Sequence, residues 1–214
     1  MIKLLGYFSA MSSLIPLVVS IYGYKKQVFD LKLLTWLFIF ATLTDLSNYI
    51  FTILSLNNLW LINLFLMVEA FVLCYVLGKW LMTKKFLVLA IILFIIYFFY
   101  WTYISLTTTI FNFTSEDKVL KGVTIIFLSS ILLIRLSTDE SIIIYHDFRF
   151  WIATGLLLYF ATTLVVFGTA NYFVDSTHRA MDFTWGISDI INIISNSLFA
   201  YGYLWYYRKI NSFT

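Results

Sequence analysis

Hydrophobic residues fill seven long stretches of the chain, and short polar segments separate one stretch from the next. The stretch from Leu59 to Met82 is typical, because its ~24 residues at ~1.5 Å of rise each would cross a hydrocarbon layer ~30 Å thick. The pattern predicts an all-α polytopic membrane protein, with one seven-helix domain over residues 1–214. The helices are expected at about residues 4–24, 32–54, 59–82, 86–105, 119–136, 150–168 and 183–207.

The composition agrees with a membrane setting. Hydrophobic residues make up 62% of the chain and charged residues 12%, with a mean hydropathy of +0.92. Soluble domains carry about 25% charged residues. We therefore expect a multi-pass protein whose main partner is the lipid bilayer. The net charge of +3 gives no reason to expect a nucleic acid.

The first hydrophobic stretch is interpreted as a retained helix rather than a signal peptide. Only Lys3 precedes it, whereas Lys25, Lys26 and Lys32 follow it. Pro16 lies inside this stretch and removes one backbone hydrogen bond, so a kink is expected there.

The distribution of basic residues predicts the orientation. Lys and Arg gather at cytoplasmic loops of membrane proteins, and Trp gathers at both interfaces. With the N-terminus outside, ten of the 14 basic residues fall on the inner side. These are Lys25, Lys26, Lys32, Lys79, Lys84, Lys85, Arg135, Arg149, Arg208 and Lys209. The four on the outer side are Lys3, Lys118, Lys121 and Arg179, so the N-terminus is expected outside and the C-terminus inside.

Polar residues recur at helical spacing inside two of the predicted spans. A helix turns ~100° per residue, so positions i, i+3, i+4 and i+7 share a face. Asp45 and Asn48 share a face of the second span, and Asp189, Asn192 and Asn196 share a face of the seventh. All five fall in the outer half of the membrane or near its middle, which predicts a polar site in the interior of the bundle.

Glu69 lies near the middle of the third span, where a charge costs on the order of 3 kcal/mol. Its own helix face is apolar, so its partner is expected on another helix. The candidates are Asp45, Asn48, Asn192 and Tyr159 of the sixth span. No basic residue is expected at this depth. Carboxylates without a cation repel one another, so such a pocket would attract a cation or a proton.

The sequence thus predicts an outward-facing acidic pocket within the membrane. Its expected residues are Asp45, Asn48, Glu69, Tyr159, Asp189, Asn192 and Asn196, with His178, Arg179 and Asp182 as an outer lid. No catalytic residue, metal site or cofactor is expected. The two histidines, His146 and His178, fall on opposite sides of the membrane, and the HExxH motif of zinc enzymes is absent.

Two segments resemble a known group of proteins. FRFWIATGLLLYFATTLVVFG and WGISDIINIISNSLFAYGYLW are similar to the last two helices of uncharacterised small multi-helix membrane proteins of the Bacteroidota. The resemblance implies a bacterial inner (cytoplasmic) membrane and implies no activity.

These features favour a pocket that binds a small ligand, cation or proton for sensing or transport, and they favour a protein that is not an enzyme. Two alternatives stay open. One is an intramembrane enzyme that modifies lipids with Asp45 and Glu69 as acid and base. The other is a structural subunit of a membrane complex, whose partner would be another membrane protein or a second copy of this chain.

Overall fold

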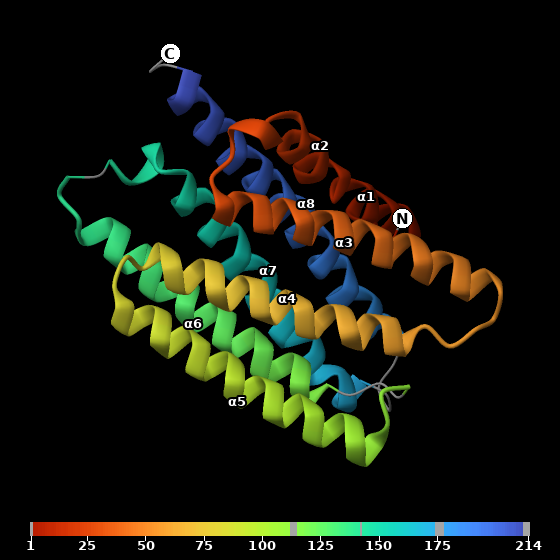
Figure 1. Cartoon of the computed structure of the whole chain (residues 1–214). Coiled ribbons are helices and arrows are strands. Elements are labelled where there is room, and N and C mark those ends of the chain that lie inside the picture. Colours follow the sequence, from red (N-terminus) through yellow and green to blue (C-terminus); the bar gives the residue numbers. More distant parts are fainter. Residues whose placement is uncertain (1, 112–114, 142, 174–177, 212–214) are drawn as a thin grey trace.

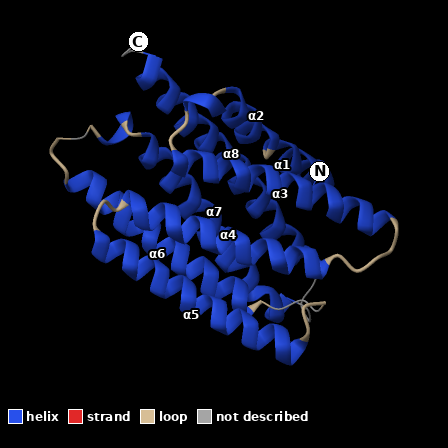
Figure 2. Cartoon of the chain, viewed as in Figure 1, coloured by secondary structure: helices blue, strands red, loops and turns tan. Residues whose placement is uncertain are grey.

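The computed structural model describes residues 2–111, 115–141, 143–173 and 178–211, and within these ranges it describes the side chains of residues 5–168 and 184–211. The described chain is 89% helix and contains no strand (Figure 2). The helices are α1 (Ile2–Ser12), α2 (Leu14–Tyr22), α3 (Phe29–Ile53), α4 (Leu59–Trp80), α5 (Lys84–Thr108), α6 (Glu116–Thr138), α7 (Phe148–Phe173) and α8 (His178–Asn211). Two short 3₁₀ turns, η1 (Tyr24–Lys26) and η2 (Ile144–His146), precede α3 and α7.

The long helices run side by side in alternating directions and form one bundle (Figure 1). We call the end that carries the N-terminus the N end, and the opposite end the C end. Along the sequence, α3, α5 and α7 run from the C end to the N end, whereas α4, α6 and α8 run back. The predicted all-α fold is confirmed.

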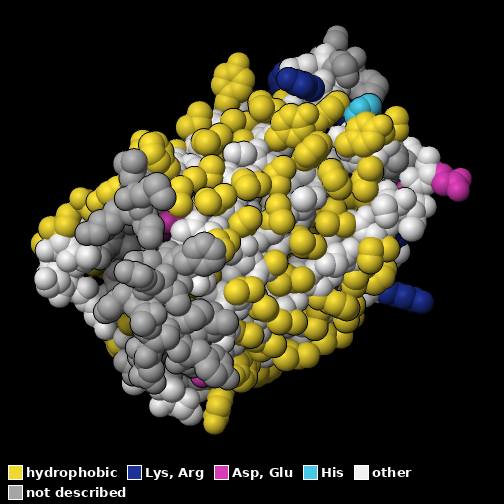
Figure 3. Space-filling view, turned by 180° about the vertical axis from the view of Figure 1, so that it is seen from behind, with side chains coloured by type: hydrophobic (Ala, Val, Ile, Leu, Met, Phe, Trp, Pro, Cys, Tyr) yellow, Lys and Arg dark blue, Asp and Glu magenta, His cyan; other side chains and the backbone are white. Residues whose placement is uncertain are grey.

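Within the described residues, five segments are long and apolar enough to cross a membrane, which fits the predicted membrane class. They are Leu5–Tyr22, Leu59–Trp80, Lys84–Thr108, Glu116–Thr138 and Phe148–Gly168. Helices α3 and α8, with 25 and 34 residues, have the length but are not among these five. Hydrophobic side chains cover much of the described surface in Figure 3, as contact with lipid requires.

The predicted kink in the first span is confirmed. Helix α1 ends at Ser12 and α2 begins two residues later. Pro16 has no N–H to donate to the Ser12 carbonyl one turn earlier, so the helix loses a bond at this point. The hydroxyl of Ser12 donates to the Ser9 carbonyl at 2.6 Å, and that of Ser13 donates to the Ala10 carbonyl at 2.7 Å.

The expected outer loop at residues 169–182 is wrong, because α7 continues to Phe173 and α8 begins at His178. Polar helical turns beyond the hydrocarbon layer need no apolar residues, so hydropathy does not detect them. The expected lid residues His178, Arg179 and Asp182 therefore belong to the first turns of α8. Their side chains lie outside the described residues.

The apolar core occupies the half of the bundle nearer the C end. Leu31 of α3, Leu77 of α4, Leu128 of α6, Ile152 of α7 and Tyr203 of α8 are each at most 1% exposed. They belong to one contiguous cluster of buried side chains. This packing fills the bundle toward its C end.

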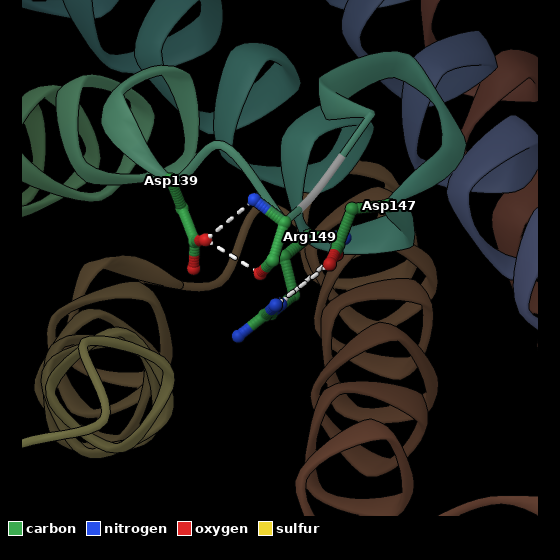
Figure 4. Close-up of polar contacts among 4 residues, drawn as sticks. Asp139, Asp147 and Arg149 are labelled. Atoms are coloured by element: carbon green, nitrogen blue, oxygen red, sulfur yellow. Dashed lines mark hydrogen bonds and ion pairs between the residues drawn. The ribbon is translucent and has the colours of Figure 1, made fainter.

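Charged residues make local contacts at the C end, in the connection between α6 and α7. The guanidinium of Arg149 donates two hydrogen bonds to the Asp147 carboxylate, at 2.9 and 2.6 Å (Figure 4). Nearby, the hydroxyl and N–H of Ser141 donate to Asp139 at 2.6 and 3.1 Å, which holds the pKa of the exposed Asp139 carboxyl below its usual range. The hydrogen bonds from Ser141 therefore stabilise the folded protein when the pH is above the pKa that Asp139 has in the unfolded chain. This stabilisation is lost as the pH falls through the lowered pKa of Asp139 in the folded protein.

Gln27 fastens the connection between α2 and α3 to helix α8. Its Nε2 donates to the Ser20 carbonyl at 2.6 Å and to the Tyr207 hydroxyl at 2.7 Å. Its Oε1 accepts a hydrogen bond from the Thr35 hydroxyl at 2.9 Å. The amide is buried, so each of these groups would lose one of its hydrogen bonds if Gln27 were apolar.

Replacing Gln27 with Leu is expected to lower the free energy of unfolding by about 1–3 kcal/mol, because buried polar groups lose a partner. The measurement is equilibrium unfolding of the protein in mixed micelles by increasing SDS. Lys25→Ala, at an exposed neighbouring position, should change stability by no more than ~0.5 kcal/mol. Equal effects of the two substitutions would contradict a fastening role for Gln27.

Candidate functional site

A pocket adjoins the apolar core on its N-end side, between α3, α4, α7 and α8. We call it the central pocket, and its volume is about 250 Å³. The polar side chains that line it include Asp45, Glu69, Tyr159, Asn192 and Asn196. Five of the seven residues predicted from the sequence therefore lie together around one space.

The other two predicted residues, Asn48 and Asp189, line an adjoining cavity of about 630 Å³. We call this space the entry cavity, and α1, α3 and α8 form its walls. Asp45 and Asn192 line both the entry cavity and the central pocket. A smaller side cavity of about 200 Å³ also includes Asp189 and Asn192. Asn192 thus stands where all three spaces meet.

Glu69 forms an ion pair with Lys121 of α6, whose Nζ donates to the Glu69 Oε2. Lys121 is only 3% exposed, and its ammonium also lies 5.4 Å from the centre of the Phe160 ring. The expectations that no basic residue shares the depth of Glu69, and that its partner is Asp45, Asn48, Asn192 or Tyr159, are therefore wrong.

The helix boundary explains why Lys121 was misplaced. The fifth span was expected to begin at Val119, which assigned Lys121 to the outer surface. Helix α6 instead begins at Glu116, so Lys121 lies in its second turn. The four-carbon stem of a lysine carries its ammonium several ångströms from the backbone, far enough to reach a carboxylate on a neighbouring helix.

Asp45 differs from Glu69 in having no charge partner. Within the described residues its carboxylate makes no ion pair and no hydrogen bond. It is close enough to Glu69 for the two carboxylates to interact electrostatically. The hydroxyl of Tyr159 interacts electrostatically with both carboxylates. Lys121 therefore balances only one of the two acids that line the central pocket.

Asn192 and Asn196 of α8 join this helix to α1. Asn192 Nδ2 donates to the Ser9 hydroxyl at 2.9 Å, and Asn196 Nδ2 donates to the Ser12 hydroxyl at 2.8 Å. Sequence analysis did not identify the two serines. Their spacing of three residues matches the four-residue spacing of the asparagines on a facing helix, and that match is the signal that could have found them.

The bundle is loosely closed between α1 and α3. Helix α1 packs on α8 and α2, and α3 packs on α4 and α2, but α1 and α3 hardly touch in the described part of the chain. Near the N end many side chains of α3 are exposed, among them Asp45 and Tyr49, the latter at 64%. The entry cavity lies in this gap. It also holds the side-chain oxygen of Asn48, which is buried and accepts no hydrogen bond from the described residues.

Comparison with known proteins provides no relative for this chain. No family model, curated protein or solved structure matches it. The resemblance to small membrane proteins of the Bacteroidota stays a prediction. Among the described residues no three His, Cys, Asp or Glu side chains are grouped closely enough to hold a metal ion.

Proposed function

We propose that this protein binds a small cation in the central pocket and uses that binding for sensing or transport. The observation that carries the proposal is the unequal state of the two acids. Lys121 balances Glu69, whereas Asp45 has no cation among the described residues. Asp45 is exposed toward the entry cavity, and an uncompensated carboxylate there attracts positive charge.

The closed C end supports binding from the N end. The apolar core and the hydrogen bonds of Gln27 lie between the central pocket and the C end. The entry cavity joins the pocket from the other side and shares Asp45 with it. A transporter would need a second arrangement in which the C end opens, whereas a sensor would need only a change in helix packing around the occupied pocket.

We propose further that the chain spans a bacterial inner membrane seven times, with the N end outside. In this arrangement α1 and α2 form one span, and α3 and α8 complete the set with the five apolar segments. The support is the excess of Lys and Arg in the segments at the C end. Labelling single cysteines at Tyr22 and Leu54 with an impermeant maleimide in intact cells tests the orientation.

Asp45→Asn is expected to weaken cation binding by roughly 10- to 150-fold, which corresponds to the ~1.5–3 kcal/mol of a charge-assisted hydrogen bond. The measurement is the Tm in lipid nanodiscs against rising concentrations of sodium, potassium, ammonium, ethylammonium and 2-phenylethylammonium chlorides. At least one cation should raise the Tm of the wild type in a saturable way.

The matched control is Glu140→Gln, which removes an exposed carboxylate at the C end and should leave the titrations unchanged. Two results would oppose the proposed function. One is that no cation in the panel stabilises the wild type, and the other is that Asp45→Asn responds as the wild type does.

One observation favours an intramembrane lipid-modifying enzyme as a second candidate. The gap between α1 and α3 would let a lipid reach Asp45 from the bilayer. The ion pair of Glu69 with Lys121 leaves Asp45 as the acid or base of such a reaction, in place of a free pair of acids. Mass spectrometry of phospholipids incubated with the protein would detect a product that Asp45→Asn does not form.

A further inference from the structure

The central pocket has a polar rim and an apolar floor, and this division indicates the kind of cation that fits it. We propose that its ligand is a monovalent amine that carries an aromatic ring or a hydrocarbon group of similar size, and that this amine enters between α1 and α3. The inference rests on the proposed function and adds the chemical class of the ligand and its route.

The floor of the pocket is built for an apolar group. Its side chains are those of Phe38, Leu73, Leu156 and Phe199. An apolar protein cavity of about 150 Å³ takes up benzene. The central pocket, at about 250 Å³, has room for one ring and a short chain that ends at the rim. A bare inorganic cation would fill none of this apolar surface.

The charges fix the direction in which such an amine would lie. Asp45 lines both the central pocket and the entry cavity, so it stands at the rim between them. Lys121 repels a second cation from Glu69, which leaves Asp45 as the site for an ammonium group. The ring then points to the floor, where aromatic side chains pack against it at favourable offset angles.

The route follows from the residues at the gap. The entry cavity is bordered by Gly6 and Tyr7 on α1 and by Asn48 and Tyr49 on α3. Both tyrosines are more than half exposed. Amines with an apolar group concentrate at the membrane interface, where Tyr rings also reside. A ligand in the outer leaflet would therefore reach Asp45 without crossing the closed core.

The test compares 2-phenylethylamine with two analogues that each lack one feature. Ethylamine keeps the charge without the ring, and 2-phenylethanol keeps the ring without the charge. Binding is measured by isothermal titration calorimetry on the full chain in nanodiscs, with empty nanodiscs subtracted to remove partition into lipid. We expect 2-phenylethylamine to bind at least ~10-fold more tightly than either analogue. Asp45→Asn should weaken the binding of 2-phenylethylamine and leave the binding of 2-phenylethanol unchanged.

Two substitutions with larger side chains test the apolar floor of the pocket and the route between α1 and α3 independently. Ala41 lines the central pocket, so Ala41→Phe should abolish binding of 2-phenylethylamine and leave ethylamine bound. Ala41→Leu is the milder variant if the larger ring prevents folding. Gly6→Trp should slow association and dissociation alike, because among the described residues a Cβ at Gly6 would meet only the Asp189 Oδ2, at 3.6 Å, and the ring can fill the gap. Met11→Trp, at an exposed position of α1 outside the cavities, is its control.

The outcomes distinguish this inference from the proposed function. If ethylamine or sodium binds as tightly as 2-phenylethylamine, and Asp45→Asn weakens both, the pocket binds cations but the ligand class is wrong. If Gly6→Trp and Met11→Trp leave the association rate equally unchanged, the route is wrong. If none of the cations binds the wild type, both the inference and the proposed function fail.

Discussion

Replacing Lys121 with Met is expected to lower the free energy of unfolding by about 3–5 kcal/mol, because it removes one partner of a buried ion pair. The ammonium of Lys121 is the only ion-pair partner that the described residues give to Glu69. Without it, Glu69 stays as a buried acid beside Asp45, with which it interacts unfavourably. The measurement is equilibrium unfolding by SDS in mixed micelles, with Lys85→Met as an exposed control.

The double variant Glu69→Leu with Lys121→Met should recover most of this loss. A buried ion pair gains attraction but loses hydration, so well-packed apolar side chains of similar volume replace it at little cost or with a gain. A double-mutant cycle over the two positions should therefore give a coupling energy of more than ~1 kcal/mol. A single Lys121→Met variant as stable as the wild type would show that the ammonium does not support Glu69 in the bilayer.

The cycle also tests the proposed function, because the double variant keeps Asp45. If cation binding depends on Asp45 alone, the double variant should bind a cation at least as well as the wild type, since the repelling ammonium is gone. If binding instead needs Glu69, the double variant loses it although it is folded. The two positions can thus be assigned separate roles, one in stability and one in binding.

Much of this architecture follows from simple sequence patterns. Apolar stretches predict where most of the helices lie, and the spacing of Asp45, Asn192 and Asn196 predicts that they face the interior of the bundle. The structure places all three around the central pocket. These predictions succeed because burial in a bilayer requires continuous apolar runs, and because a polar side chain inside such a run avoids lipid by facing another helix.

The partners across helices could not be predicted in this way. Lys121 was assigned to the surface because a shift of three residues in the start of α6 decides whether its ammonium points to water or to Glu69. The gap between α1 and α3 depends on how far apart two helices pack, which no spacing within one helix records. Sequence patterns therefore predict residues that line the pocket. They do not predict that Lys121 pairs with Glu69, or that the bundle is open between α1 and α3.

Gly155→Leu is expected to cost about 3 kcal/mol or more in the free energy of unfolding and to reduce the central pocket. A Cβ at Gly155 of α7 would lie 2.6 Å from Cε1 of Phe199 and 3.2 Å from the backbone oxygen of Ser195, both on α8. The Phe199 ring can turn away only into the pocket that it lines, and the Ser195 oxygen can move only if the two helices separate. Close backbone approach at small residues is how membrane helices pack, so few other adjustments remain.

A second glycine of the same helix provides the matched comparison. A Cβ at Gly168 meets none of the described side chains within 4 Å, so Gly168→Ala should be neutral or should stabilise the protein by up to ~1 kcal/mol through the better helix propensity of Ala. Gly155→Ala should fall between these limits, with a loss of ~1–2 kcal/mol, because the ring of Phe199 yields to a methyl group more easily than to a leucine. SDS unfolding measures stability, and calorimetry with 2-phenylethylamine measures the space that remains. If Gly155→Leu unfolds at the same SDS fraction as Gly168→Ala, the contact between α7 and α8 is looser than the structure places it, and the floor of the pocket is not fixed by Phe199.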